Sequence, residues 1–387
     1  MADQTEILED GIYFELDEKI YHAQERLSAS GICKMLISPP TFWAQSWLNP
    51  DRDEVDWDTQ ARILGRAYHT ARFEPEQLHQ RFVAMIDPDD YPGVLTNATM
   101  IENALEHLGQ PKTQKGEKVL DKAYRLLGAG YSGKVLHVLQ EMWEGELNGR
   151  TPIKSEYFRQ LQRDIALLQK VPDVAKHLTG GFAEVSVLWT DERTGIKMKC
   201  RFDYLKVKSF TDFKTYDNSM GKDMEQCIID QFRFNRYYIQ AKLYHEVTEL
   251  IRKGKIERVQ GVASKAQIAL IDEIAARKVP LECWYVFQEK SGIPNLFARE
   301  IHLMTPVHES HPHNDAGVSH ETSQEVAQRT RRLSGLGKLA DNHIEVAKNQ
   351  FAGYSDTYAP GEPWLTQLPT GSINDDCFSP YWLGLEN

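Results

Sequence analysis

The stretch RFDYLKVKSFTDFKTYDNS, residues 201–219, places Asp203, Asp212 and Lys214 in a largely apolar, β-prone segment. Asp203 lies nine residues before Asp212, and Lys214 follows two residues after Asp212. Residues i and i+2 of a strand share a face, so Asp212 and Lys214 point the same way. Phe213 then packs on the opposite face. The pattern predicts a strand with a polar cluster on one side.

The two acids meet if this segment forms a hairpin that turns near Lys208-Ser209. Glu184, in the preceding strand pattern FAEVSVLWTD, can then join the same face. Carboxylates this close repel one another, and Lys214 cannot neutralise three of them. A divalent cation can, and oxygen ligands favour Mg²⁺ or Mn²⁺ over zinc. We therefore predict a metal-dependent phosphodiesterase centre in which Lys214 orients water. The alternative is a salt network between Asp212 and Lys214 on a solvated face.

Composition is that of an ordinary globular protein. The 387 residues are 41% hydrophobic and 26% charged, without an apolar run long enough for a membrane span. The acidic N-terminus lacks a basic-then-apolar leader, and five scattered cysteines without a C-x-x-C pair favour reduced thiols. We expect a cytoplasmic protein that does not bind membranes. The net charge of −11 argues weakly against a non-specific polyanion binder but permits a nuclease that gathers carboxylates around cations.

Helical patterns precede the strands. LSASGICKMLISPPTFWAQSWL predicts a helix that begins at a Ser28 or Ser30 cap and ends before Pro39-Pro40, followed by a second short helix. DTQARILGRAYHTARF predicts another helix, and residues 1–26 suggest a short extended segment. Residues 86–165 mix helix and loop, so we expect a helical elaboration between core elements.

Alternating patterns begin after Gly180-Gly181. FAEVSVLWTD, IKMKCRFDYLKV and SFTDFKTY predict three strands, and ECWYVFQEK and LFAREIHLM predict two more. Between them, one long helix is predicted from residue 223 to about 253 and another around 264–277. TPVHESHPHNDAGVSHETS reads as a polar linker, and a polar helix near 322–350 and an aromatic tail follow. The chain thus divides into an α/β domain, 1–304, and an extension, 305–387.

Further motifs accompany D-x-K in a fixed order. GRAYH has the G-x-x-x-H spacing and contains His69, AEVSVLW contains Glu184, KCRFDYL contains Asp203, and YYIQAKLY has the Q-x-x-x-Y spacing with Gln240 and Tyr244. This order resembles the RecB-like branch of the PDDEXK nucleases. More narrowly, YHAQERLSASGICKMLISPPTFW, GRAYHTARFEP, KMKCRFDYL and DFKTYDNS resemble the exonuclease VIII (RecE-type) C-terminal nuclease domain.

The resemblance covers roughly residues 20–300 and implies an α/β PDDEXK core, a mixed central sheet flanked by helices, with a helical insertion and a C-terminal extension. It also implies a set of site residues: the metal ligands His69, Asp203, Asp212 and the main-chain carbonyl of Phe213, the further acid Glu184, the water-activating Lys214, and the supporting pair Gln240 and Tyr244. One departure is Phe202, which stands before Asp203 where the superfamily name expects proline.

The same resemblance implies a Mg²⁺-dependent exonuclease, with Mn²⁺ as a substitute, that degrades linear duplex DNA from its ends in the 5′ to 3′ direction. It implies a single-strand annealing partner, a homo-oligomer, and a recombination role in a bacterial or phage-infected cell. Two alternatives stay open. One is an endonuclease or a single-strand or flap nuclease on the same centre, and the other is a non-catalytic DNA-binding module on a retired nuclease fold.

Three more residues are candidates for DNA contact. Arg66 lies three residues before His69 on the same helical face, and Arg201 lies two before Asp203, so either could grip a 5′-terminal phosphate. For Arg66 the alternative is a surface salt bridge. Tyr237 belongs to the basic and aromatic run QFRFNRYYIQAKLYH, which suits either nucleic-acid binding or core packing. The histidine-rich part of the polar linker is expected to be a solvated loop.

Overall fold

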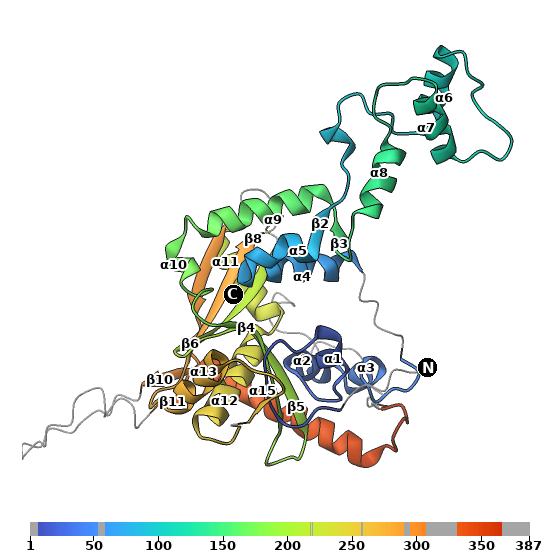
Figure 1. Ribbon diagram of the computed structural model, residues 1–387. Coiled ribbons are helices and arrows are strands. Elements are labelled where there is room, and N and C mark those ends of the chain that lie inside the picture. The colour runs from blue at the N-terminus through green and yellow to red at the C-terminus, as the bar shows by residue number, and fades with distance from the viewer. Residues whose placement is uncertain are drawn as a thin grey trace, which may run out of the picture.

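The centre of the molecule is a mixed seven-stranded sheet (Figure 1). The computed structural model describes residues 7–52, 59–216, 218, 220–256, 258–289, 295–306 and 331–365. The strand order is β7-β1-β4-β5-β6-β8-β9, with β1–β7 and β6–β8 parallel and the other neighbours antiparallel. The strands are β1 (Gly11–Tyr13), β4 (Phe182–Thr190), β5 (Lys197–Leu205), β6 (Ser209–Tyr216), β7 (Val259–Gln260), β8 (Glu282–Glu289) and β9 (Leu296–Glu300).

The predicted hairpin is present and has the predicted facing. β5 and β6 are antiparallel neighbours, and Lys206 N donates to Ser209 O across the turn at 2.8 Å. Phe213 is buried in a different apolar cluster from Phe210 and Tyr216. Asp212 and Lys214 therefore lie on the side away from the Phe213 ring, as the alternation predicts.

Helices cover both faces of the sheet, which confirms the predicted α/β architecture (Figure 1). On one side, α4 (Gln60–Phe73), α9 (Ser155–Leu168) and α10 (Pro172–Ala175) enclose a core with Phe213 and Val286. On the other side, a larger core joins the sheet to α2 (Ala29–Ile37), α12 (Tyr237–Arg252), α13 (Lys265–Ala275) and α15 (Gly335–Thr357). Other helices of this body are α1 (Glu18–Ala23), α3 (Pro39–Gln45), α5 (Leu78–Arg81) and α11 (Met224–Phe234).

A helical lobe projects from this body (Figure 1). It contains α6 (Ala98–His107), α7 (Val119–Gly128) and α8 (Leu136–Gly145), which enclose an apolar cluster of their own. The parallel pair β2 (Phe82–Ala84) and β3 (Thr151–Ile153) lies at its base. The helical elaboration expected over residues 86–165 is therefore shorter, because α9 packs on α4 in the main body.

Two local expectations are wrong. Residues 1–26 do not form a simple extended segment, since the described part contains β1 and α1, and α1 begins at an Asp17 side-chain cap. The single helix expected from residue 223 to about 253 is two helices, α11 and α12. The break lies at Asn235-Arg236, where Arg236 has a φ of 54°. Buried apolar residues occur in both helices, so the apolar pattern alone does not reveal the break.

The C-terminal helix α15 belongs to the larger core. Ala340, Ile344 and Ala347 are buried in it, and Trp364 packs on Phe42. The predicted helix near 322–350 thus starts later, at Gly335, and its first part lies outside the described residues. The pair β10 (Met304–Pro306) and β11 (Arg331–Leu333) precedes it, while most of the polar linker with its histidines, and the aromatic tail after residue 365, lie outside the described residues. Among the described helices, none combines the length and apolar character that crossing a membrane requires.

Candidate metal centre

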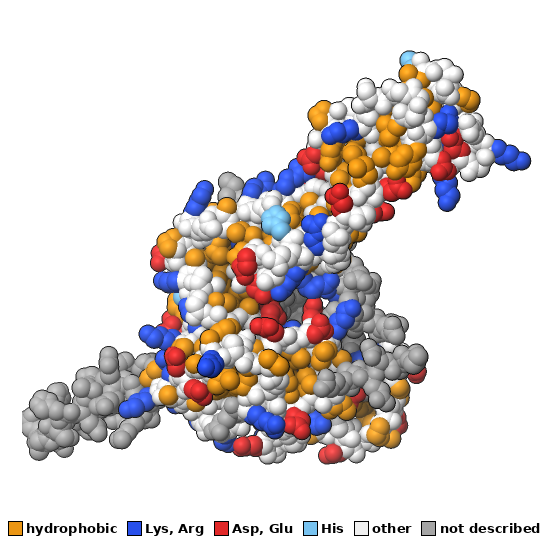
Figure 2. All heavy atoms as spheres, viewed as in Figure 1, with side chains coloured by type: hydrophobic (Ala, Val, Ile, Leu, Met, Phe, Trp, Pro, Cys, Tyr) orange, Lys and Arg blue, Asp and Glu red, His pale blue; other side chains and the backbone are white. Residues whose placement is uncertain are grey.

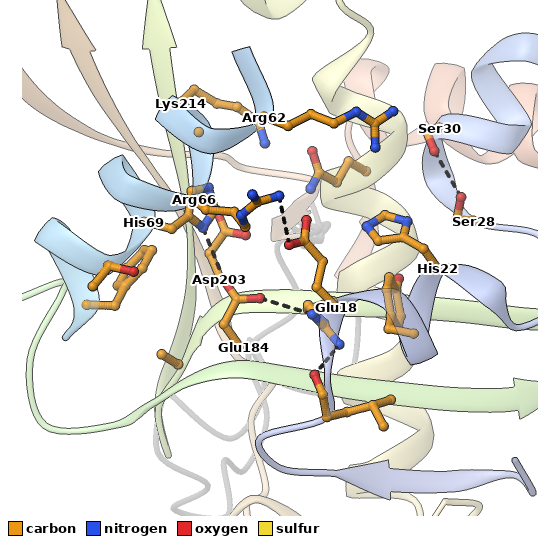
Figure 3. A pocket seen from close by; sticks show the side chains of 18 of the residues that line it. Glu18, His22, Ser28, Ser30, Arg62, Arg66, His69, Glu184, Asp203 and Lys214 are labelled. Atoms are coloured by element: carbon orange, nitrogen blue, oxygen red, sulfur yellow. Dashed lines mark hydrogen bonds and ion pairs between the residues drawn. The ribbon is translucent and has the colours of Figure 1, made fainter. Parts of the chain in front are cut away.

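A cavity of about 1220 Å³ opens between the two helical layers at the edge of β4, β5 and β6. Figure 2 shows acidic and basic side chains gathered around this hollow. Its walls come from segments far apart in the sequence, namely α1, α2, α4, the three strands and the start of α12. Figure 3 shows how the polar side chains converge on it. The cavity therefore collects residues from both helical layers and from the middle of the sheet.

Three potential metal ligands meet in this cavity. Among the described residues, one ligand atom each of His69 on α4, Glu184 on β4 and Asp203 on β5 lies within 4.8 Å of the other two. His69 Nδ1 is 3.1 Å from Glu184 Oε1 (Figure 3). Glu184 has a φ of 54°, which is left-handed and costly for a residue with a side chain. Strain of this kind within a strand is typical of functional sites.

Asp203 and Asp212 lie where β5 and β6 separate. The two strands are paired at Tyr204–Thr211 and Leu205–Phe210, next to the turn. Just beyond this pair, Phe213 N donates to Asp203 Oδ2 at 2.8 Å, so a carboxylate occupies the place of the next ladder bond. The fork in the sheet therefore presents both acids side by side.

Asp212 is held by the other two predicted site residues. It forms an ion pair with Lys214, and Gln240 Nε2 on α12 donates to its Oδ1 at 2.6 Å. Lys214 Nζ also lies 5.1 Å from the centre of the Tyr237 ring, within cation–π range. Asp212 does not join the three-ligand group, although the hydrogen bond from Phe213 N to Asp203 ties the two acids together.

Burial and crowding of like charges shift the pKa values of these groups. Burial and the nearby Asp203 carboxylate raise the pKa of Asp212 to about 7, against the influence of Lys214. Burial disfavours the charged form of His69, but Asp203 and the hydrogen bond with Glu184 outweigh it and raise the pKa of His69 to about 9. In the metal-free protein, protons on His69 and Asp212 thus offset part of the negative charge of the three carboxylates.

The residues present fit a divalent cation. Two carboxylates and an imidazole form a compact donor set, and Asp212 adds a third carboxylate at its edge. Asp212 Oδ2 is buried and pairs with the Lys214 ammonium, while its Oδ1 accepts a hydrogen bond from Gln240 Nε2. His69, Glu184 and Asp203 could hold the ion, with Asp212 and the Phe213 carbonyl as further donors.

The remaining predicted residues fall into different places. Tyr244 lines the cavity but is largely buried, and its ring packs on Phe202 and Phe210. Phe202, which stands where proline was expected, is fully buried in this aromatic group. Tyr244 therefore packs against the aromatic side chains of the two strands that carry the acids.

The two candidate arginines, Arg201 and Arg66, differ in their contacts within the protein. Arg201 donates to Ser186 Oγ and to Leu16 O, each at 2.8 Å, and lies 3.5 Å from Glu184 Oε2. These partners orient Arg201 toward the protein. Arg66 lies at the cavity wall, 3.7 Å from Glu18 Oε2 (Figure 3), a long and weak contact that a phosphate could replace.

Sequence reasoning missed one cavity residue for which a signal existed. Arg62 lines the cavity and lies four residues before Arg66 and seven before His69, so the three share one helical face. His22 on α1 and Ser28, the N-cap residue of α2, also line it. Nothing in their local sequence indicates this, because only the packing of the N-terminal segment places them there.

The chain is similar to a protein family and to a solved structure. A crystal structure of a protein from Eubacterium rectale, named "Putative exonuclease", aligns over 87% of both chains with a TM-score of 0.40 and 15% sequence identity. No curated protein matches the sequence. Residues 28–282, which include the donor set, Lys214 and Gln240, match the family described as a PDDEXK-like domain of unknown function (DUF3799). The chain therefore belongs to this PDDEXK-like family.

Proposed function

We propose that the protein is a Mg²⁺- or Mn²⁺-dependent DNA exonuclease that digests linear duplex DNA from its ends in the 5′ to 3′ direction. The observation that carries the proposal is the cluster of His69, Glu184 and Asp203 beside the Asp212–Lys214 pair. Membership of the PDDEXK-like family supports a nuclease. The likeness of the motif order to the RecE-type exonucleases supports the action on ends.

Bound at the donor set, a divalent cation would polarise the scissile phosphate and lower the pKa of a water molecule. Lys214 would act on the same phosphate or water molecule from a position beside the cation. Its ammonium is held by Asp212 on one side and Tyr237 on the other, and both Asp212 and Asp203 outweigh burial and raise the pKa of Lys214. Lys214 therefore stays charged, and its remaining hydrogens can orient the attacking water or stabilise charge on the phosphate.

The wall of α4 suits the DNA backbone. Arg62, Arg66 and His69 follow one face of the helix, and a rise of 1.5 Å per residue places their Cα atoms along about 10 Å. This stripe leads from the cavity wall to the donor set, so we assign Arg62 and Arg66 to the phosphates next to the scissile one. Gln240 keeps Asp212 oriented during the reaction.

Linear duplex DNA labelled separately at its 5′ and 3′ ends tests the proposal. With Mg²⁺ or Mn²⁺ the wild-type protein should release the 5′ label first, and chelator or Asp212→Ala should abolish release. Closed-circular duplex should stay intact, since it has no end. Cleavage of the circle would favour an endonuclease, and cleavage of single strands or flaps alone would favour that class.

No digestion of any of these substrates with either metal would contradict a nuclease. DNA binding that needs no metal would then favour a non-catalytic module on a retired nuclease fold. The annealing partner and the homo-oligomer stay predictions. Light scattering of the purified protein, alone and with single-stranded product, tests the oligomer.

A further inference from the structure

A buried polar triad lies on the side of the sheet that faces α4. Arg72 on α4, Asp164 on α9 and Gln288 on β8 are all inaccessible to solvent. Arg72 Nε donates to Gln288 Oε1 at 2.9 Å, Arg72 Nη2 donates to the same oxygen, and Gln288 Nε2 donates to Asp164 Oδ2. Arg72 Nη2 is also 3.5 Å from Asp164 Oδ2. The triad thus joins three elements through residues that are at least 92 positions apart in the sequence.

The triad adjoins the metal centre through Phe213. The Arg72 guanidinium lies 5.6 Å from the centre of the Phe213 ring, and the rings of His69 and Phe73 lie 6.2 Å from it. Three side chains of α4 therefore surround this ring. Phe213 stands between Asp212 and Lys214, and its main-chain N–H holds Asp203. Any shift of α4 along β6 would move His69 relative to both acids.

Stability does not account for the triad. Burial raises the pKa of Asp164 in spite of Arg72, so the pair does not fully repay the loss of water. Arg72 Nη1 and Asp164 Oδ1 are buried and have no hydrogen-bond partner among the described residues, so the lost hydration of these two polar atoms is not compensated. Apolar side chains of similar size would fill the space at lower cost. What they would lack is directional bonding between α4 and β8.

We infer that Arg72, Asp164 and Gln288 are positioning residues that fix α4, and with it His69, against Phe213 so that the donor set is assembled before a cation arrives. This role rests on the proposed function of the site as a metal centre. Groups that orient metal ligands from behind typically alter metal affinity or activity by about 10- to 100-fold when they are removed.

The test replaces the whole triad, so that no buried charge is left unpaired. Arg72→Met, Asp164→Leu and Gln288→Leu are combined, and calorimetry measures Mn²⁺ affinity while single-turnover digestion measures rate. We expect the thermal midpoint to be maintained, Mn²⁺ binding to weaken about 10- to 100-fold, and the maximal rate to fall with little change in KM for DNA. The control combines Glu117→Leu with Arg125→Met, which removes an ion pair in the projecting lobe and should leave Mn²⁺ affinity and rate unchanged.

If the triple variant does not fold, the single variant Arg72→Lys tests the inference instead. It keeps the charge beside Asp164 but loses the two-nitrogen contact with Gln288, so Mn²⁺ affinity should still fall. Wild-type affinity and rate in a folded triple variant, or in Arg72→Lys, would overturn the inference. A wild-type protein that binds Mn²⁺ but cuts no DNA would refute the proposed function alone. The effect of the triad on Mn²⁺ affinity could still be measured in that case. A wild-type protein that binds no Mn²⁺ would refute both.

Discussion

Lys214 and Asp212 form an ion pair in which the two side chains differ in their access to the cavity. Asp212 is almost fully buried between Lys214 and Gln240, whereas Lys214 retains access to the cavity. Lys214 offers no ligand atom to a cation while it is protonated. Its contribution should therefore appear in the chemical step and not in metal binding.

Lys214→Met should lower the single-turnover cleavage rate by about 10²- to 10⁴-fold, the range of a lost proton-transfer or charge-stabilising group. Mn²⁺ affinity should be maintained or improved, because a competing positive charge is gone. Lys222→Met, in an exposed ion pair with Asp230, is the matched control and should be neutral. A loss of Mn²⁺ affinity equal to the loss of rate would show that Lys214 shapes the metal site and not the chemistry.

Metal affinity should depend on pH in a direction set by two raised pKa values. The pKa of His69 is about 9 and that of Asp212 about 7 in the metal-free protein, so a cation must displace protons. Mn²⁺ affinity should fall about tenfold per pH unit from pH 8.5 to 7 and more steeply below 7. Calorimetry in buffers of different ionisation enthalpy measures both affinity and proton release. Affinity that is flat, or that rises as pH falls, would contradict the assignment of these ligands.

At the scale of elements, the break between α11 and α12 shapes one rim of the cavity. Arg236 has a left-handed backbone with a φ of 54°, and Asn235, Arg236 and Tyr237 all line the cavity. A continuous helix would carry these side chains along a single axis. The break instead ends α11 and starts α12 so that Tyr237 and Gln240 face Lys214 and Asp212.

Arg236→Gly should separate the backbone role from the charge. Glycine adopts the left-handed conformation without steric cost, so the free energy of unfolding should stay the same or rise by up to about 1 kcal/mol. DNA affinity should fall, because a cavity cation is lost. Asn148→Gly, at a φ of 49° in the projecting lobe, is the control and should leave DNA affinity unchanged. A clear loss of stability in Arg236→Gly would mean that the side chain itself holds the break.

At the scale of the whole molecule, the two additions to the sheet core differ in how they are attached. The projecting lobe encloses its own apolar cluster, whereas α15 contributes buried residues to the larger core. Their sequences do not reveal this difference. Both are amphipathic helical segments outside the strands, and the matched family segment includes the lobe but ends before α15.

Deletion of the projecting lobe should therefore preserve the folded protein, whereas deletion of α15 should destabilise it. Replacing residues 91–148 with a Gly/Ser linker of about 12 residues, which spans roughly 20 Å, should preserve folding and Mn²⁺ affinity. Removing residues 331–387 exposes the surfaces that bury Ile344 and Trp364, and should cost about 5 kcal/mol or more, comparable to the whole stability of a typical domain. Circular dichroism during thermal unfolding measures both. A stable protein without α15, or an unfolded one without the lobe, would contradict this division of the core.

The strands and the facing of their acids were predictable because they follow from local rules. Alternation at Asp212, Phe213 and Lys214 has a period of two, and the structure has that facing. The order of the motifs indicated a PDDEXK core, which the sheet and the family match confirm. The roles proposed for the site residues stay predictions, although the structure brings His69, Glu184 and Asp203 together as the motif order implies.

The strand faces, the acids on the β5–β6 hairpin and the shared helical face of Arg66 and His69 could be predicted from the sequence alone, since each depends on neighbours within a few residues. Contacts of Arg201 with Ser186 and Leu16, and the meeting of Arg72, Asp164 and Gln288 behind the site, could not be predicted in this way. The same holds for the place of α15 in the larger core. These contacts join residues from 15 to more than 200 positions apart, and backbone periodicity carries no information across such distances. Burial of the whole core brings the elements together, and their shapes then select which side chains touch.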